Sequence, residues 1–196
     1  MKKTNILAAA VLMSAVSAYA FTAQAKPLTA EEFAAKAAIS GKFEIESSKV
    51  ALERSQNEEV KSFAKTMIDD HTKADKELKA AAAEAKLSPT ALPDDLDEKH
   101  LKKVNKLKEA KAEDFDNHYL EAQEEAHDDA VDLFEDYIKD GEAGPLKDFA
   151  SKTLPTLKEH EKHAESLEEK HDDKGHTDAK PAAATDVKET KEEPKK

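Results

Sequence analysis

The chain of 196 residues has no cysteine and no tryptophan, and it has only four glycines, seven phenylalanines and three tyrosines. The absence of cysteine excludes disulfide bonds, thiolate metal sites and thiol nucleophiles. β-Sandwiches and barrels need aromatic strands and glycine-rich turns, so this composition argues against both classes. Ala, Glu, Lys and Leu dominate instead, as in long helices. The sequence therefore predicts an all-α protein.

Positive charge is also in short supply, with 31 Lys and Arg against 43 Asp and Glu and a net charge of -12. Such a chain repels phosphate backbones, so we expect no nucleic-acid partner. The sequence contains no glycine-rich phosphate loop, no serine nucleophile elbow and no His-Glu-x-x-His motif. We therefore expect no enzyme. The sequence indicates neither a protein partner nor an oligomeric state.

The first 25 residues have the pattern of a signal peptide. Lys2 and Lys3 precede an apolar run over Ile6–Val16, and a small-x-small cleavage pattern ends at Ala25, with an alternative cut after Ala20. No later segment reaches 18 apolar residues, so we expect no membrane span. These features predict an exported protein, soluble in a bacterial periplasm.

The mature chain is predicted to form long helices followed by a loose end. Thr29 and Glu32 match a capping box at the start of the first helix, and Asn57 can cap the second. Pro145 suits the first position of the last helix, which Pro155 should kink. We expect helices over 29–55, 57–87, 98–111, 113–139 and 145–171, a connector over 87–97, and a disordered charged tail over 172–196.

Each of the four long segments has a single apolar stripe at helical spacing. Four such stripes are buried best against one another, which predicts an antiparallel four-helix bundle over residues 26–171 with a short extra helix in the crossover connection. The stripe of the fourth segment comprises Tyr119, Leu120, Gln123, His127, Ala130, Val131, Phe134 and Ile138.

Three stripes contain a histidine, and the fourth contains a carboxylate. His71, His127 and His160 replace apolar residues, and Glu44 holds the equivalent place on the first helix. Glu44 lies 13 residues before Asn57 and His71 lies 14 after it, so we expect the two to face each other across the first hairpin. The same count around the turn near residues 142–143 puts His127 and His160 at about one level.

These four residues are candidate ligands of one transition-metal ion. Imidazole and carboxylate together suit zinc, iron, copper or nickel. Glu124 and Met67, each about one turn before a histidine of the set, are additional candidates. A di-iron oxidase site is disfavoured, because Ile68 and Leu157 stand where further carboxylates would be needed.

Two other interpretations of the polar layer remain open. A Glu44–His71 hydrogen bond would fit a network that only fixes helix register, in a structural, interaction or stress-related protein of the cell envelope. Buried imidazoles would also make the core sensitive to pH near neutrality.

Charge is unevenly distributed along the second half of the chain. Residues 98–111 have a net charge of +4 (six Lys, two Glu), and residues 113–140 a net charge of -11 (one Lys, twelve acids). We expect the basic helix to pack near the acidic one and offset its self-repulsion. The alternative is an acidic surface for cations or for a basic partner.

Several ordered motifs resemble one bacterial family. They include the segment Phe43-Glu44-Ile45-Glu46, the run from Val60 to His71, and Leu154-Pro155-x-Leu157-x-x-His160. The resemblance is to an exported family of ferritin-like domains of unknown function, often labelled "predicted outer membrane protein", and it covers about residues 29–168. It implies a ferritin-like bundle without established activity, whose recurrent Glu and three His match Glu44, His71, His127 and His160. The chain departs from the family at Lys111-Ala112, where relatives have a small residue and Gly.

Overall fold

The computed structural model describes residues 26–177, so the predicted signal peptide over 1–25 and most of the predicted tail, residues 178–196, lie outside it. The described residues form helices and no strand, as the composition predicts. The elements are α1 (Ala30–Arg54), α2 (Glu58–Glu84), the 3-10 helix η1 (Pro89–Ala91), α3 (Glu98–Glu109), α4 (Phe115–Asp140) and α5 (Pro145–Thr177).

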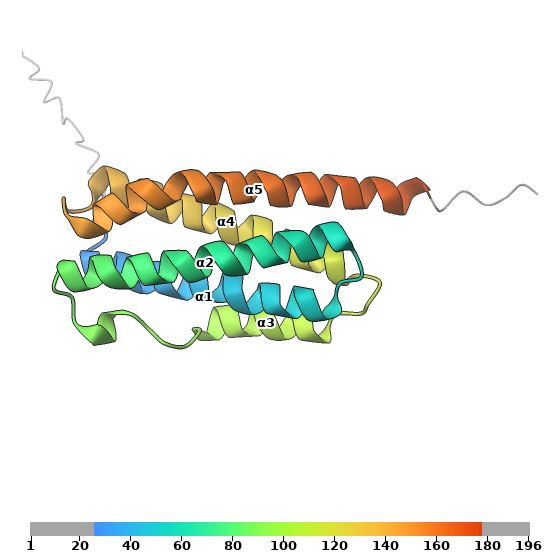
Figure 1. Cartoon of the computed structure of the whole chain (residues 1–196), viewed down its shortest axis with the longest axis horizontal. Helices are drawn as coiled ribbons and strands as arrows, with labels where there is room; N and C mark the ends of the chain where they lie inside the picture. Colours follow the sequence, from blue (N-terminus) through green and yellow to red (C-terminus); the bar gives the residue numbers. More distant parts are fainter. Residues whose placement is uncertain (1–25, 178–196) are drawn as a thin grey trace, which may run out of the picture.

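The four long helices form an antiparallel bundle of two hairpins, α1–α2 and α4–α5 (Figure 1). Helix α1 packs on α2 and α4, and α5 packs on α4 and α2. The crossover connection between the hairpins contains η1 and α3, and α3 lies along the outside of α1 (Figure 1). The predicted bundle with its extra connecting helix is confirmed.

Local sequence signals account for most helix ends. The capping box at Thr29 is present, with Thr29 N–H donating to Glu32 Oε2 at 2.8 Å, and Asn57 Oδ1 accepts from Glu59 N–H at 2.9 Å. Helix α2 ends three residues earlier than predicted, followed by Lys86 in a left-handed conformation with φ 58°.

Helix α5 is longer than predicted. It continues through Pro155, where the expected kink stays a prediction, and past His171 to Thr177. The first residues of the predicted tail, up to Thr177, therefore belong to the helix.

The core has two apolar clusters, one on each side of a polar layer. The first, here called the α3 half, includes two residues of α3 and consists of Phe43, Val50, Ala51, Val60, Phe63, Ala64, Met67, Val104, Leu107, Phe115, Tyr119, Leu120, Ala126, Ala164 and Leu167. The second, the far half, consists of Phe33, Ala34, Ala37, Leu78, Ala81, Ala130, Val131, Phe134, Tyr137, Leu146, Phe149, Ala150 and Leu157.

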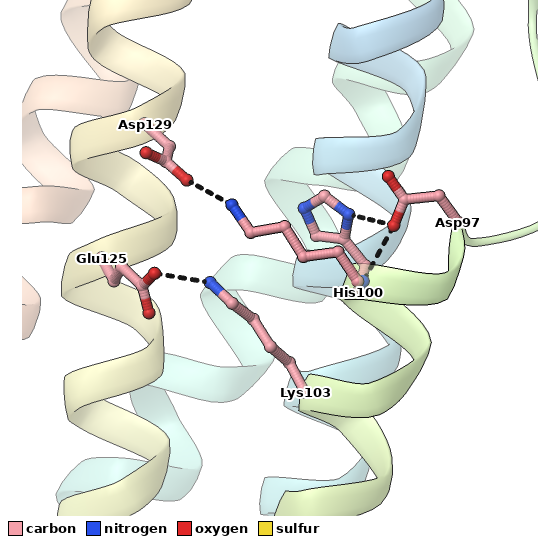
Figure 2. Close-up of polar contacts among 6 residues, drawn as sticks. Asp97, His100, Lys103, Glu125 and Asp129 are labelled. Atoms are coloured by element: carbon pink, nitrogen blue, oxygen red, sulfur yellow. Dashed lines mark hydrogen bonds and ion pairs between the residues drawn. The ribbon is translucent and has the colours of Figure 1, made fainter.

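The basic helix α3 does pack near the acidic helix α4. Lys99 Nζ lies 3.2 Å from Asp129, and Lys103 Nζ lies 3.0 Å from Glu125. A dashed line in Figure 2 marks the ion pair between Lys103 and Glu125. The ion pairs confirm the expected packing of the basic helix near the acidic one. Among the described helices, none is both long enough and apolar enough to cross a bilayer.

Candidate metal centre

Three histidines from three helices meet between the two halves of the core. His71 of α2, His127 of α4 and His160 of α5 are 6%, 1% and 6% exposed. Their ring centroids are 5.5 to 5.6 Å apart, and one nitrogen of each lies within 4.8 Å of the others. The expected common level of His127 and His160 is confirmed, and His71 lies in the same layer.

Two of the rings are held by hydrogen bonds that define their tautomers. His127 Nδ1 lies 2.8 Å from the backbone oxygen of Gln123, and His160 Nε2 lies 3.0 Å from Asp70 Oδ2. A carbonyl oxygen and a carboxylate only accept, so both ring nitrogens must donate. The lone pairs are therefore on His127 Nε2 and His160 Nδ1.

Those same lone pairs have no hydrogen-bond partner. His127 Nε2, His160 Nδ1 and His71 Nε2 are all buried and unpaired. A buried polar atom without a partner costs about 1–3 kcal/mol, and buried polar groups are nearly always satisfied. Three neighbouring rings that each have such a nitrogen are therefore an unusual feature of the described core.

Burial keeps the three rings neutral. It lowers the pKa of His71 well below its usual range, with smaller contributions from the neighbouring rings. Burial also lowers the pKa of His127 to about 4 and that of His160, where the Asp70 carboxylate acts in the opposite direction. Neutral imidazole is the form that binds metal ions.

Glu44 lies beside His127 and not opposite His71 as expected. Its Oε1 is 4.0 Å from His127 Nδ1, whereas a Cβ placed on Gly41 would lie 3.9 Å from His71 Nδ1. Helix α1 ends at Arg54 and α2 begins at Glu58, so the turn is centred near residue 56, one residue earlier than the count assumed. That shift puts Gly41 at the level of His71.

The Glu44 carboxyl is itself an unsatisfied buried group. Neither of its oxygens has a hydrogen-bond partner. Burial raises its pKa to about 8, against smaller lowering effects of the nearby Gln123 amide and of Lys103. At neutral pH the carboxyl is therefore mostly protonated, and it must lose its proton to act as a ligand.

The other candidate ligands lie outside the group of three. Among the described residues, the metal-type cluster comprises the histidines and leaves out both Glu44 and Glu124. Glu124 is half-buried on α4, and Met67 is fully buried in the apolar α3 half.

A residue outside the predicted ligand set also contacts the site. Asp70 of α2 reaches across to His160 of α5. Its position next to His71 was the available signal, since a residue at the margin of one stripe lies near the next helix of the bundle.

A cavity of about 30 Å³ borders His71 on the side of the far half, with Gly41, Leu78 and Phe134 among its lining residues. Its size suits about one water molecule. Glycine at position 41 leaves this space next to the ring.

Two solved structures have a similar fold. One is the crystal structure of a DUF305 fragment from Deinococcus radiodurans, with a TM-score of 0.62 and 17% identity, covering 74% of this chain and 99% of that one. The other is CopM in the Cu(II)-bound form, with a TM-score of 0.61 and 15% identity over the same shares of both chains. Both likenesses show the ferritin-like helical bundle.

None of the curated proteins matches the chain. A sequence family described as "Domain of unknown function (DUF4142)" matches residues 15–167. This match covers most of the chain and agrees with the resemblance seen in its motifs. The protein belongs to the DUF4142 family.

Proposed function

We propose that the protein binds one transition-metal ion in the bundle core, through His71 Nε2, His127 Nε2 and His160 Nδ1. Two observations carry this proposal: these three nitrogens are buried without partners, and one nitrogen of each ring lies within 4.8 Å of the others. A bound cation would satisfy all three lone pairs at once.

The donor set narrows the choice of ion. Three imidazoles suit zinc, copper, iron or nickel. One structural neighbour, CopM, is described in its Cu(II)-bound form, and this supports copper as the first ion to test. Glu44, whose Oε1 lies 4.0 Å from His127 Nδ1, is our proposed fourth ligand, reached by side-chain rotation and loss of its proton. Glu124 and Met67 are left out of this set.

The alternative function is structural, with the polar layer acting as a hydrogen-bond network. The Asp70–His160 and Gln123–His127 contacts are two bonds of such a network. The unpaired nitrogens and both unpaired oxygens of Glu44 favour binding over this alternative.

We further propose that binding takes place after export to the periplasm and without catalysis. The basic start, apolar run and cleavage pattern of residues 1–25 support export. The family match names no enzymatic activity.

Metal analysis of protein purified without a His-tag or chelating resin tests the proposal. We expect about one metal ion per chain after loading with Cu(II) or Zn(II), and loss of that ion in His71→Ala and His127→Ala. His118→Ala is the matched control, because His118 lies on the same helix as His127 but outside the buried layer, with its side chain 39% exposed. A protein that takes up no metal, and whose melting temperature is unchanged by zinc, copper, nickel and iron, would refute the proposal in favour of the structural alternative.

A further inference from the structure

Asp70 connects the surface of the bundle to the buried histidine layer. Its side chain is 44% exposed, and its Oδ2 lies 3.0 Å from Nε2 of His160, whose side chain is only 7% exposed. The bond also joins the two hairpins, because Asp70 is on α2 and His160 on α5.

The three rings differ in what holds them. Among the described residues, Asp70 is the one charged group that makes a hydrogen bond to any of the three rings. His127 is held by the neutral backbone oxygen of Gln123, and the Glu44 oxygen near it is 4.0 Å away and unpaired. The ring of His160 is therefore the place where a fixed negative charge acts on the layer.

We infer that Asp70 is a positioning residue that sets the charge preference of the layer, favouring a divalent over a monovalent cation. The inference rests on the proposed function. By accepting from Nε2–H, Asp70 orients the Nδ1 lone pair of His160 toward the other two rings. A carboxylate bonded to a ligating imidazole also makes the ring a stronger donor.

The preference for divalent ions follows from Coulomb's law. The attraction between a fixed negative charge and a cation grows in proportion to the charge of the cation. The Asp70 carboxylate thus stabilises a divalent ion about twice as much as a monovalent ion at the same position. For copper, it stabilises Cu(II) over Cu(I) and lowers the reduction potential of the bound ion.

Asp70→Asn separates charge from position, because the amide oxygen can still accept from His160 Nε2–H. We expect the dissociation constant for Cu(II) to rise about 10- to 100-fold. The dissociation constant for Cu(I), measured under anaerobic reducing conditions, should rise by roughly the square root of that factor, about three- to tenfold. The difference corresponds to a rise in the reduction potential of bound copper by about 30 to 60 mV, since tenfold is 59 mV for one electron.

Asp69→Asn is the matched control. It makes the same change in charge one residue earlier, where the carboxylate is 62% exposed and is paired with Lys65 Nζ at 2.6 Å. We expect it to leave both dissociation constants and the potential close to those of the wild type. Asp70→Glu restores the charge, so it should return the potential toward the wild-type value.

The outcomes distinguish this inference from the proposed function. If the wild type binds neither Cu(II) nor Cu(I), the proposed function fails and the role of Asp70 fails with it. If the wild type binds copper but Asp70→Asn weakens the binding of Cu(II) and Cu(I) by equal factors, then Asp70 does not set the charge preference. The same conclusion follows if Asp70→Asn has no more effect than Asp69→Asn. An unchanged potential in an Asp70→Asn protein that retains copper would overturn the inference in the same way.

Discussion

The α3 half and the far half of the core bury polar atoms in different ways. In the α3 half, the Ser48 and Tyr119 hydroxyls lie 2.8 Å apart, and Gln123 Nε2 donates to Ser47 Oγ at 3.1 Å. The far half is held by ring contacts, such as Phe33 stacked on Tyr137 with centroids 4.0 Å apart. These two hydroxyls and this amide nitrogen are paired, although Gln123 Oε1 and Asp116 Oδ1 are buried without a partner.

The histidine layer between the halves differs because its unpaired atoms are adjacent. One nitrogen of each of its three neighbouring rings is buried without a partner, whereas the Ser48 and Tyr119 hydroxyls and Gln123 Nε2 of the α3 half are paired. This contrast teaches that a buried polar residue, even one with an unpaired atom, is a weak functional signal by itself. Several adjacent rings without partners are the informative part.

The largest expected effect tests the far half. Phe33→Ala should lower the free energy of unfolding by about 3–5 kcal/mol, because it removes a fully buried ring in contact with other rings. Chemical denaturation measures this loss. Leu101→Ala is the control, since Leu101 is 48% exposed on α3 and its truncation should have little effect. A loss below about 1 kcal/mol for Phe33→Ala would mean that ring packing does not dominate the far half.

An intermediate effect concerns the pH dependence of the metal-free protein. The pKa of His127 is about 4 in the folded protein, whereas an imidazole in the unfolded chain has its usual value of 6.5. Between these two pH values the unfolded chain therefore binds more protons than the folded protein. The free energy of unfolding should therefore fall as the pH is lowered through this window. Glu44 acts in the opposite direction, because burial raises its pKa in the folded protein from 4.5 to about 8. Its contribution to the free energy of unfolding is complete below pH 4.5 and is lost as the pH rises to about 8.

Above pH 6.5, the free energy of unfolding of the wild type should decline by about 1.4 kcal/mol per pH unit for one proton. Glu44→Gln should remove this decline. Denaturation at pH 6.5 and pH 8 in the presence of a chelator measures the change. Glu46→Gln alters a more exposed carboxylate on the same helix and should keep the decline. An equal decline in both variants would show that Glu44 is not the responsible group.

The smallest expected effect compares the layer directly with the α3 half. His71→Leu replaces a ring that has an unpaired buried nitrogen with an apolar side chain, so the metal-free protein should be as stable as the wild type or up to about 1 kcal/mol more stable. Tyr119→Phe leaves the Ser48 hydroxyl without its partner and should lower stability by about 1 kcal/mol. Chemical denaturation in chelator compares the two, and a large loss for His71→Leu would mean that the layer is structural.

The sequence predicted the bundle well because its signals are local. Apolar spacing, the caps at Thr29 and Asn57 and the proline-containing connector are each set within a few residues. The three histidines were found for the same reason, since each interrupts an apolar stripe. The end of α4 shows the limit of this approach, because Tyr137 is buried where the stripe predicted Ile138, which is half-buried.

Contacts between helices were harder to predict. The expected neighbour of Glu44 depended on where the turn between α1 and α2 is centred. Because the assumed centre was one residue too late, we expected His71 as the neighbour, whereas Glu44 lies beside His127. Asp70 was missed because a stripe describes one helix alone, while the Asp70–His160 bond depends on how α2 and α5 pack.

The histidine layer draws on both hairpins, with His71 in the first and His127 and His160 in the second. An ion held by all three would tie these hairpins together across the entire crossover connection, much as a removable cross-link closes a long loop. The two hairpins could then separate only after the ion had left. Occupancy of the layer would thereby set how quickly the bundle opens, as well as how stable it is.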